Sequence, residues 1–244
     1  MNAYFTDGTE EGFFTAVFDA FRDRDGIVTS SRAFQMPIGC TPVDVASDAE
    51  KAARVKKKLR QYAPKSVREI SLLLRSGNGQ KEQIALEYVR LIMQKRAAVS
   101  EMLSLPAVIA AAEEIKKVTS EAHRFTGFLR FMESSEGIFY APFSPDNDIL
   151  DLILPHFMRR LKNQPFVIHD TLRNKAALYN TKECVIAQTE EKISLSLSER
   201  EASFQSLWKG YYASVNVAER PHEKQMKNYM PVRYWKYMPE KNGP

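Results

Sequence analysis

Cysteine and histidine are scarce in this sequence, and their placement argues against the common metal and cluster sites. The two cysteines, Cys40 and Cys184, lie far apart with no CxxC or Cys/His spacing. A disulfide framework, a cysteine-based zinc site and an iron–sulfur cluster are therefore not expected within the chain. The four histidines form neither HExxH nor another metal-ligand spacing. We accordingly expect no metal site and no cofactor.

Long apolar runs and the common catalytic motifs are also missing. No apolar stretch approaches the roughly 18 residues that span a bilayer, so we expect a cytoplasmic protein with no membrane partner. GxSxG, Walker A and GxGxxG sequences are absent, and Gly77-Asn-Gly79 is predicted to be a turn because no lysine-serine follows it. No motif therefore identifies a reaction.

The sequence does have the composition of a globular protein with a modest excess of positive charge. Its 244 residues are 44% hydrophobic and 27% charged, which is enough apolar material for a buried core. The net charge of +5 is compatible with nucleic-acid binding but does not by itself indicate it.

Residues 1–122 are predicted to form an N-terminal strand followed by a mainly helical region. The predictions rest on hydrophobic spacing, turn residues and helix-start signals. In chain order, the expected elements are a strand at 3–6, a helix from Thr9, a strand at 27–29, a loop at 34–46, helices from capping boxes at Ser47-Asp-Ala-Glu50 and Ser66-Val-Arg-Glu69, a helix from about Lys81 past Arg96, and a helix from Pro106 to about Glu121.

Basic residues gather at two places before the tail. The densest run comprises Lys51, Arg54, Lys56, Lys57, Lys58 and Arg60. This run could face phosphates, but a solvated helix face is favoured because Ala52, Val55 and Leu59 supply an apolar stripe opposite. Arg124 and Arg130, near the start of a predicted strand, are candidate contacts to nucleic acid or to a protein partner.

Residues 123–195 change at Thr126 from helical to alternating periodicity. From about 126 to 188 the pattern is β-β-α-β-β-β, in which the helix is expected to begin at Ser144-Pro145. The strands are expected at 128–132, 138–141, 166–169, 176–179 and 184–187. Strands joined by short turns pair antiparallel. We therefore expect an α+β fold in which an antiparallel sheet packs with the N-terminal helices and a C-terminal helical segment.

Residues 196–244 form a third segment, rich in aromatic and basic residues, and we expect the three segments to make one compact domain. A capping box, Ser198-Glu-Arg-Glu201, begins a helix whose regular apolar stripe predicts burial in the core. The stripe comprises Phe204, Leu207, Trp208, Tyr211, Tyr212 and Val215. Beyond this stripe prolines interrupt the helical periodicity. We therefore expect the functional contacts of the tail in the segment after Val217. The candidate contacts to nucleic acid or to a partner are Arg220, Arg233, Tyr234, Trp235 and Lys236.

A second group of residues could form a catalytic pocket. His169, Asp170 and Arg173 end one strand and begin its turn, where they could provide a base or bind an anion. Turn capping by Asp170 and a surface ion pair of Arg173 explain the same residues equally well. His123 and His156 would join the pocket only if the fold brought them there, and packing is favoured for His156.

Several motifs resemble a bacterial family described as probable DNA-metabolism proteins. The resemblance covers nearly the whole chain and is most specific after about residue 120. It rests on His123-Arg-Phe-Thr-Gly-Phe-Leu-Arg-Phe131, Tyr140-Ala-Pro-Phe-Ser-Pro-Asp-Asn-Asp-Ile-Leu150, Pro155-His-Phe, Phe166-Val-Ile-His-Asp170, Leu207-Trp-Lys-Gly-Tyr-Tyr-Ala-Ser and Met230-Pro-Val-Arg-Tyr-Trp-Lys. The tail resembles that family's C-terminal domain of unknown function, which is also found fused to uracil-DNA-glycosylase-like proteins.

The resemblance implies a DNA context and a protein partner. Members of that family are typically encoded beside a radical SAM protein thought to act in DNA modification or repair. Radical chemistry would belong to that partner, because this chain lacks the cysteine triad of an iron–sulfur cluster. One departure is Arg220-Pro-His222, where histidine stands in place of an expected asparagine.

Three hypotheses from different classes follow. The leading one is an accessory protein that acts with a radical SAM partner through binding to nucleic acid or to that partner. The second is an enzyme that acts on a nucleotide or phosphodiester through the histidine, aspartate and arginine pocket. The third is a purely structural interaction module that uses the tail as its docking surface.

Overall fold

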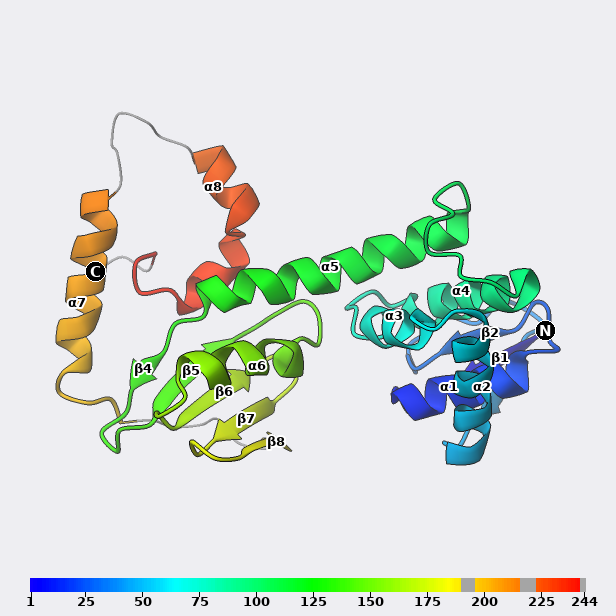
Figure 1. Ribbon diagram of the computed structural model, residues 1–244, viewed down its shortest axis with the longest axis horizontal. Coiled ribbons are helices and arrows are strands. Elements are labelled where there is room, and N and C mark those ends of the chain that lie inside the picture. The colour runs from blue at the N-terminus through cyan, green and yellow to red at the C-terminus, as the bar shows by residue number, and fades with distance from the viewer. Residues whose placement is uncertain (190–195, 216–222, 242–244) are drawn as a thin grey trace. The chain divides into compact units, whose positions relative to one another are not determined.

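The computed structural model describes residues 1–189, 196–215 and 223–241. The chain divides into two compact units, Met1–Thr119 and Ser120–Pro244, and the boundary lies inside helix α5, Pro106–Phe128. Both units combine helices and strands (Figure 1), which confirms the expected mixed composition. No helix in the described part of the chain is long and apolar enough to cross a membrane.

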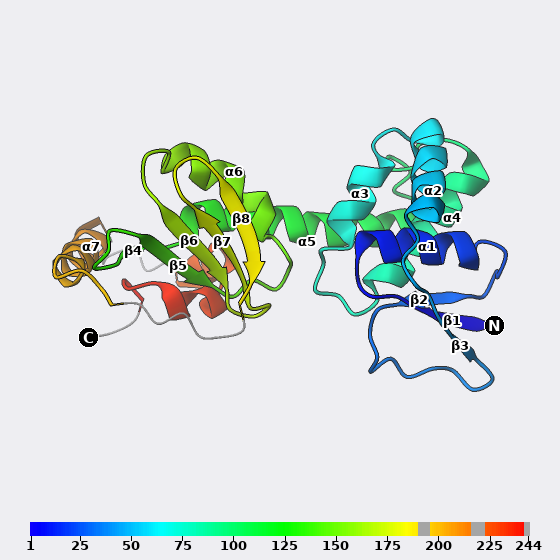
Figure 2. The same ribbon diagram turned by 90° about the horizontal axis from the view of Figure 1, so that it is seen from below.

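The N-terminal unit is built on a small parallel sheet (Figure 2). Its strands are β1 (Asn2–Phe5), β2 (Ile27–Thr29) and β3 (Thr41–Asp44), and β1 pairs parallel with both of the others. Strand β3 corrects the expectation of an uninterrupted loop over 34–46. Three of its four residues are exposed, so the segment lacks the apolar alternation that predicts a strand, and Pro42 suits an edge position.

Helices complete the N-terminal unit. Helix α1 (Glu10–Ala20) begins where predicted, because the Thr9 hydroxyl accepts the Gly12 N–H at 2.9 Å. The remaining helices are α2 (Ala49–Tyr62), α3 (Ser66–Leu73) and α4 (Lys81–Lys95). The core of the unit gathers apolar side chains from β1, β2 and all of these helices.

The two predicted capping boxes of this unit are wrong in detail. Helix α2 is capped by Asp48, whose carboxylate accepts two first-turn N–H groups at 2.9 and 3.0 Å, while the Ser47 hydroxyl donates to Asp7 at 2.8 Å. At α3 the Ser66 hydroxyl donates to the Ala63 carbonyl at 2.6 Å, and no side chain caps the helix. Both helices nevertheless form where predicted, and each buries an apolar stripe.

The basic run on α2 forms a solvated, internally paired face. Lys51 contacts Asp19 at 2.8 Å, and Lys56 contacts Glu10 at 2.7 Å. The buried face opposite consists of Ala52, Val55 and Leu59. The structure therefore shows the solvated helix face that the sequence favours for this basic run.

The C-terminal unit contains a five-stranded mixed sheet (Figure 1). In spatial order its strands are β4 (Met132–Glu133), β5 (Phe139–Phe143), β6 (Phe166–Asp170), β7 (Lys175–Tyr179) and β8 (Cys184–Gln188). The expected antiparallel sheet is only partly matched, because β5 and β6 pair parallel while the other neighbours pair antiparallel. The cause is helix α6 (Leu150–Arg160), since a strand–helix–strand connection makes consecutive strands run parallel.

Two element boundaries in this unit differ from the prediction. Helix α5 continues to Phe128, residues 129–131 are irregular, and the strand expected at 128–132 begins only at Met132 as β4. Phe125 and Leu129, four residues apart, are 4% and 8% exposed, and the Leu129 N–H donates to the Phe125 carbonyl at 3.2 Å, so burial holds the end of the helix at this point. Helix α6 begins at Leu150 and not at Ser144-Pro145, because the preceding residues form a loop whose Asn147 is buried.

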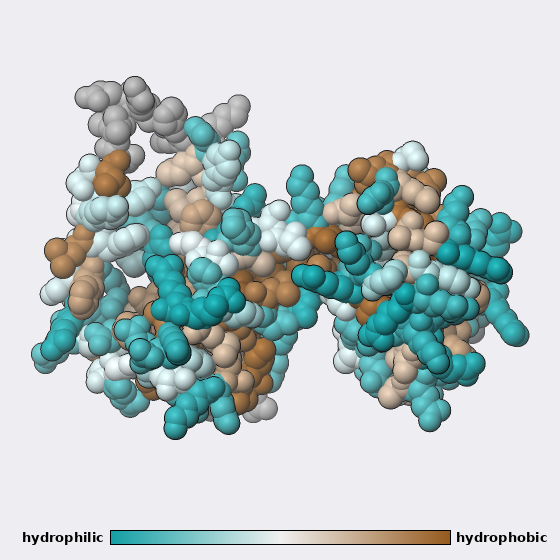
Figure 3. Space-filling view, in the orientation of Figure 1, coloured by the Kyte–Doolittle hydropathy of each residue, from teal (hydrophilic) through white to brown (hydrophobic). Residues whose placement is uncertain are grey.

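Burial along the first tail helix contradicts the prediction. The regular stripe on α7 (Glu201–Val215) predicts a core helix, yet Leu207 is 70% exposed, Tyr211 58% and Trp208 38%. Apolar side chains accordingly appear in brown along α7 in Figure 3. Periodicity identifies the apolar face of a helix but does not show what covers that face.

The end of the tail is instead the buried part. After α8 (Glu223–Tyr229) the short 3-10 helix η1 (Val232–Tyr237) buries Tyr234 to 3% exposure, and Met238 just beyond it to 1%. The sequence predicts that α7 is buried and that the end of the tail is exposed, and the structure shows the reverse. Arg220 and His222 lie outside the described residues.

Candidate functional site

The three described histidines of the predicted pocket lie on three different elements. His123 is exposed on α5, His156 is half-buried on α6 against the Phe157 ring at 4.9 Å, and His169 is buried on β6. Within the described ranges no hydrogen bond or ion pair joins these histidines to one another, and no His, Cys, Asp and Glu group suits a metal ion. The structure does not assemble them into one catalytic group.

His169 is part of a buried hydrogen-bonded pair. Its Nδ1 lies 2.8 Å from the Tyr140 hydroxyl, and its Nε2 lies 3.4 Å from the Thr189 hydroxyl. Burial lowers the pKa of His169, and the neighbouring Asp170 only partly opposes this effect. Its imidazole therefore remains neutral near pH 7 and holds β6 to β5.

We expect the stability of the C-terminal unit to fall as the pH drops below 6.5, the ordinary pKa of histidine. In that range the unfolded chain binds a proton at position 169 that the folded protein excludes, so protonation favours unfolding. Urea unfolding at pH 7.5 and 5.5, followed by tryptophan fluorescence, measures this loss. His169→Gln removes the titrating group and should show a smaller loss between the two pH values. An equal loss in both proteins would contradict this assignment.

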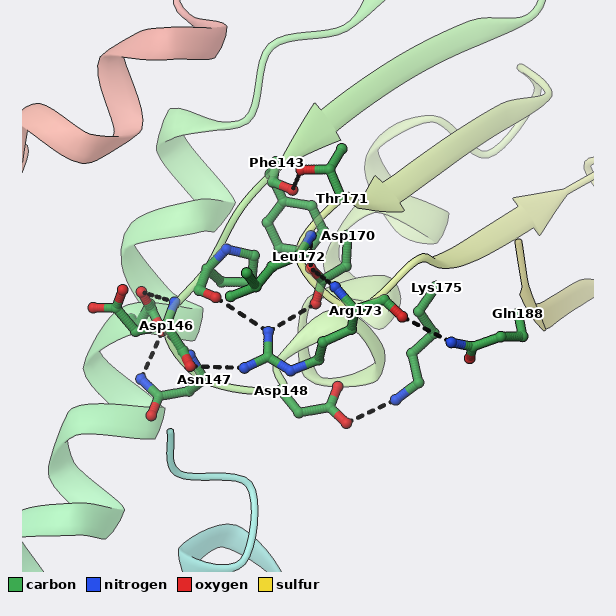
Figure 4. Close-up of polar contacts among 12 residues, drawn as sticks. Phe143, Asp146, Asn147, Asp148, Asp170, Thr171, Leu172, Arg173, Lys175 and Gln188 are labelled. Carbon is green, nitrogen blue, oxygen red and sulfur yellow. Dashed lines mark hydrogen bonds and ion pairs between the residues drawn. The ribbon is translucent and has the colours of Figure 1, made fainter. Parts of the chain in front are cut away.

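Asp170 and Arg173 do lie together, as a clamp on the β6–β7 turn (Figure 4). The fully buried Asp170 carboxylate accepts the Leu172 and Arg173 backbone N–H groups at 3.0 and 3.2 Å and pairs with the Arg173 guanidinium at 3.0 Å. That guanidinium also donates to the Pro145 and Asp146 carbonyls at 3.1 and 2.7 Å. The pair thus fixes the turn to the loop before α6. Asp170 and Arg173 therefore have the turn-capping and ion-pairing roles that the sequence suggests as alternatives to a catalytic or anion-binding role.

Arg233 and Tyr234 attach the end of the tail to the same loop and to α5. The Arg233 guanidinium contacts Asp146 at 2.6 Å, and the Tyr234 hydroxyl donates to the buried Glu121 carboxylate at 2.8 Å. Burial, followed by the charge of Glu121, raises the pKa of Tyr234, so the phenol remains a donor. The buried Tyr234 ring is not available to a base, whereas the Arg233 side chain is 49% exposed.

The remaining predicted contact residues occupy varied positions. The Trp235 indole N–H donates to the Met230 carbonyl at 3.1 Å, and exposed Lys236 lies over the Tyr237 ring at 5.0 Å. Arg124 is half-buried on α5. These residues do not gather at one cavity, but Arg130 does line one.

The described part of the C-terminal unit contains a cavity of 590 Å³ between the end of α5, the β4–β5 edge, the end of α6 and helix α7. Its lining combines cationic and aromatic side chains with a few carboxylates. Those side chains are Arg130, Arg160, Arg200, Phe131, Phe139, Phe157, Phe204, Trp208, Glu133 and Glu201. A volume of this size lies in the roughly 300–1,000 Å³ range of small-molecule sites.

Hydrogen bonds to β4 hold α7 as one wall of this cavity, and the two elements lie side by side in Figures 1 and 2. The Glu201 carboxylate accepts the Glu133 N–H at 2.9 Å. Ser198 completes the join: its N–H donates to the Glu133 carbonyl at 2.9 Å, and its hydroxyl to the Glu133 carboxylate at 3.0 Å. The predicted capping box therefore joins α7 to a strand.

Arg130 is paired inside the cavity wall. Its guanidinium contacts Glu240 at 2.6 Å and lies 5.1 Å from the Trp208 ring centroid. Burial acts to raise the pKa of Glu240, but hydrogen bonds from Arg130, the backbone and Trp208, together with the charge of Arg130, outweigh it in sum, so the carboxyl pKa is lowered. Arg160 and Arg200 are exposed, and neither has an ion pair with any described residue.

Sequence reasoning identified Arg130 but missed Arg160, Arg200 and Phe204 as members of one site. Arg130 and Arg160 lie 30 positions apart, and Arg200 lies still farther along the chain. The sequence around Arg200 and Phe204 predicts only a helix. No spacing rule connects them, because the cavity is produced by tertiary packing of α7 on β4. The one local signal is the adjacent pair of arginines that ends α6.

The fold and the cavity thus define a two-unit protein of mixed helices and strands, with a pocket lined by arginine and aromatic side chains in its second unit. The family model of DUF4130, a domain of unknown function, matches residues 79–240, and the chain belongs to this family. The match includes every described residue of the pocket. No curated protein matches the chain.

Proposed function

We propose that this protein is an accessory factor in DNA metabolism or repair that binds nucleic acid and acts with a radical SAM enzyme. The observation that supports it most is the cavity beside α7, where arginines without a described carboxylate partner lie beside exposed aromatic rings. Arginine contacts phosphate oxygens, and aromatic rings stack on bases regardless of sequence. The basic net charge of +5 favours the same partner.

The partner enzyme is proposed from the motifs that resemble the DNA-metabolism family. With only two cysteines, this chain cannot supply the cysteine ligands of its own iron–sulfur cluster. The division of labour follows from this count: the partner performs the radical step, and this chain holds or presents the nucleic acid.

We expect binding to fluorescently labelled DNA to weaken steeply as salt rises. Each phosphate contact contributes a slope of about −0.7 to −0.9 in log affinity against log salt, because counterions are released on binding. Fluorescence anisotropy at several salt concentrations measures the slope, with and without the coexpressed radical SAM protein. Absence of salt-dependent binding to any DNA, alone and with the partner, would refute the proposal.

A purely structural interaction module is the second candidate. It is favoured by the exposed apolar face of α7, where Tyr211 and Val215 are 58% and 55% exposed. Contiguous exposed apolar surface often marks a protein-binding site. Copurification with the radical SAM protein in the absence of DNA binding would support this candidate over the first.

A further inference from the structure

The cavity beside α7 has two kinds of wall. Its floor is closed, because the Phe131 ring contacts Phe157 and Phe166 edge-on at 5.3 and 5.9 Å between centroids. Its outer wall is open to solvent: Phe204 is 56% exposed and Trp208 38%. A planar ligand can therefore reach these two rings from outside, whereas the floor is already filled.

The cations of the cavity also differ in availability. Arg130 is neutralised by Glu240, whose side chain is 1% exposed, and it lies against Trp208. Arg160 and Arg200 remain exposed without a carboxylate partner among the described residues. These two are the groups that can contact an incoming anion, and Arg130 positions the Trp208 ring.

Two carboxylates, Glu133 and Glu201, line the same cavity. Both already accept hydrogen bonds: Glu133 from the Ser198 hydroxyl at 3.0 Å, and Glu201 from the Gln205 amide at 2.8 Å. Glu240 balances the charge of Arg130, and neither lining glutamate has an ion pair with Arg160 or Arg200. The lining therefore offers two exposed arginines to an anionic group, two open aromatic rings to a planar ring, and carboxylates that can accept hydrogen bonds from N–H groups.

We propose that this cavity binds one unstacked nucleotide of single-stranded DNA, with the base against Phe204 and Trp208 and its phosphate at Arg160 and Arg200. This inference rests on the proposed nucleic-acid binding and adds the strand state that is recognised. A base inside a duplex is stacked on both faces and cannot reach a ring in a pocket unless it leaves the helix. One nucleotide combines the ring, the anionic phosphodiester and the N–H groups that the lining fits.

The test uses the full-length protein, a labelled single-stranded oligonucleotide and a duplex of the same sequence. Wild type should bind the single strand at least about tenfold more tightly than the duplex, since one base–aromatic stack and its phosphate contacts are lost in duplex DNA. Arg160→Ala combined with Arg200→Ala, and separately Phe204→Ala, should each weaken single-strand binding about tenfold.

Two neighbouring side chains provide matched controls. Arg159 ends the same helix as Arg160, is equally exposed and does not line the cavity. Leu207, 70% exposed on α7, likewise lies outside the lining. Arg159→Ala and Leu207→Ala should keep single-strand affinity within about twofold of wild type, because surface substitutions away from a site have small effects.

The outcomes separate the two proposals. Equal affinity for single strand and duplex, or equal losses in the Arg159 and Arg160–Arg200 variants, would overturn the pocket and leave DNA binding by general charge attraction. No binding to either DNA would overturn the proposed function and the pocket together. Selective weakening by the cavity variants, with both controls unchanged, establishes the nucleotide site.

Discussion

Replacing Glu121 by alanine is expected to destabilise the C-terminal unit by about 3–5 kcal/mol, the cost of removing one partner from a buried charged network. The Glu121 side chain is 3% exposed. Its Oε1 accepts the Asp146 N–H at 3.1 Å and the Tyr234 hydroxyl at 2.8 Å. Its Oε2 accepts the backbone and side-chain N–H groups of Asn147 at 2.8 and 2.6 Å.

The large effect follows from the number of donors that would be left without an acceptor. Alanine removes the carboxylate acceptor of all four of these N–H and O–H groups, and each buried group that is left unsatisfied costs about 1–3 kcal/mol. Tyr234→Phe removes only one hydrogen bond and should cost about 1 kcal/mol. The carboxylate thus joins three segments: α5, the loop before α6, and η1.

Urea unfolding followed by tryptophan fluorescence reports this effect cleanly. Both tryptophans, Trp208 and Trp235, lie in the C-terminal unit, so the signal does not depend on the N-terminal unit. Glu113→Ala is the matched control, because Glu113 is an exposed carboxylate on the same helix. A loss below about 1 kcal/mol for Glu121→Ala, or equal losses for both glutamates, would contradict the buried network.

Local periodicity was sufficient for most elements of the fold. The strands expected at 166–169, 176–179 and 184–187 differ by at most one residue at each end from β6, β7 and β8, because short apolar runs between polar turns leave little choice of structure. The parallel pairing of β5 and β6 does not follow from the short-turn rule, although its cause is in the predicted order, because the helix between these two strands acts as a crossover.

The tail shows where local patterns fail. Helix α7 has a clean apolar stripe and is exposed, whereas η1 lacks a stripe and is buried through Tyr234. The difference is tertiary: Tyr234 has a buried acceptor in Glu121, 113 positions away in the sequence. Hydrophobic spacing contains no information about so distant a partner, so neither the anchor nor the exposed wall of the cavity was predictable.

The candidate site was predictable only in its composition. Arginines and aromatic residues in the C-terminal half were expected to contact nucleic acid, and Arg130 belongs to both the predicted set and the cavity. Arg233 and Tyr234 instead attach η1 to Asp146 and Glu121. Residue type indicates the chemistry that a segment offers, but burial and pairing decide which residues remain free to perform it.

Asp170→Ala is expected to cost about 3 kcal/mol, close to the effect of Glu121→Ala, because it leaves the Arg173 guanidinium without its carboxylate partner. Asp170 is 0% exposed and Arg173 24% in their side chains. The partial exposure of the arginine lets water replace some of the lost interaction, which places the expected cost at the lower end of the range for buried pairs. Tryptophan fluorescence during urea unfolding measures it as for Glu121.

A double-mutant cycle distinguishes a clamp from two independent turn residues. Arg173→Ala leaves the buried Asp170 charge unpaired and should cost about as much as Asp170→Ala. The double variant should then lose at least about 1 kcal/mol less than the sum of the single losses, since the residues interact directly. Additive losses would contradict the clamp.

The neighbouring pair Lys175–Asp148 is the matched control for this cycle. Its atoms lie at 2.7 Å, closer than the 3.0 Å of Arg173–Asp170, but its side chains are 31% and 32% exposed. A half-exposed pair contributes only about 0–1 kcal/mol, so Lys175→Ala should have a small effect despite the shorter distance. Burial of the carboxylate, and not the separation of the charges, therefore determines which of the two pairs on β6 and β7 holds this end of the sheet together.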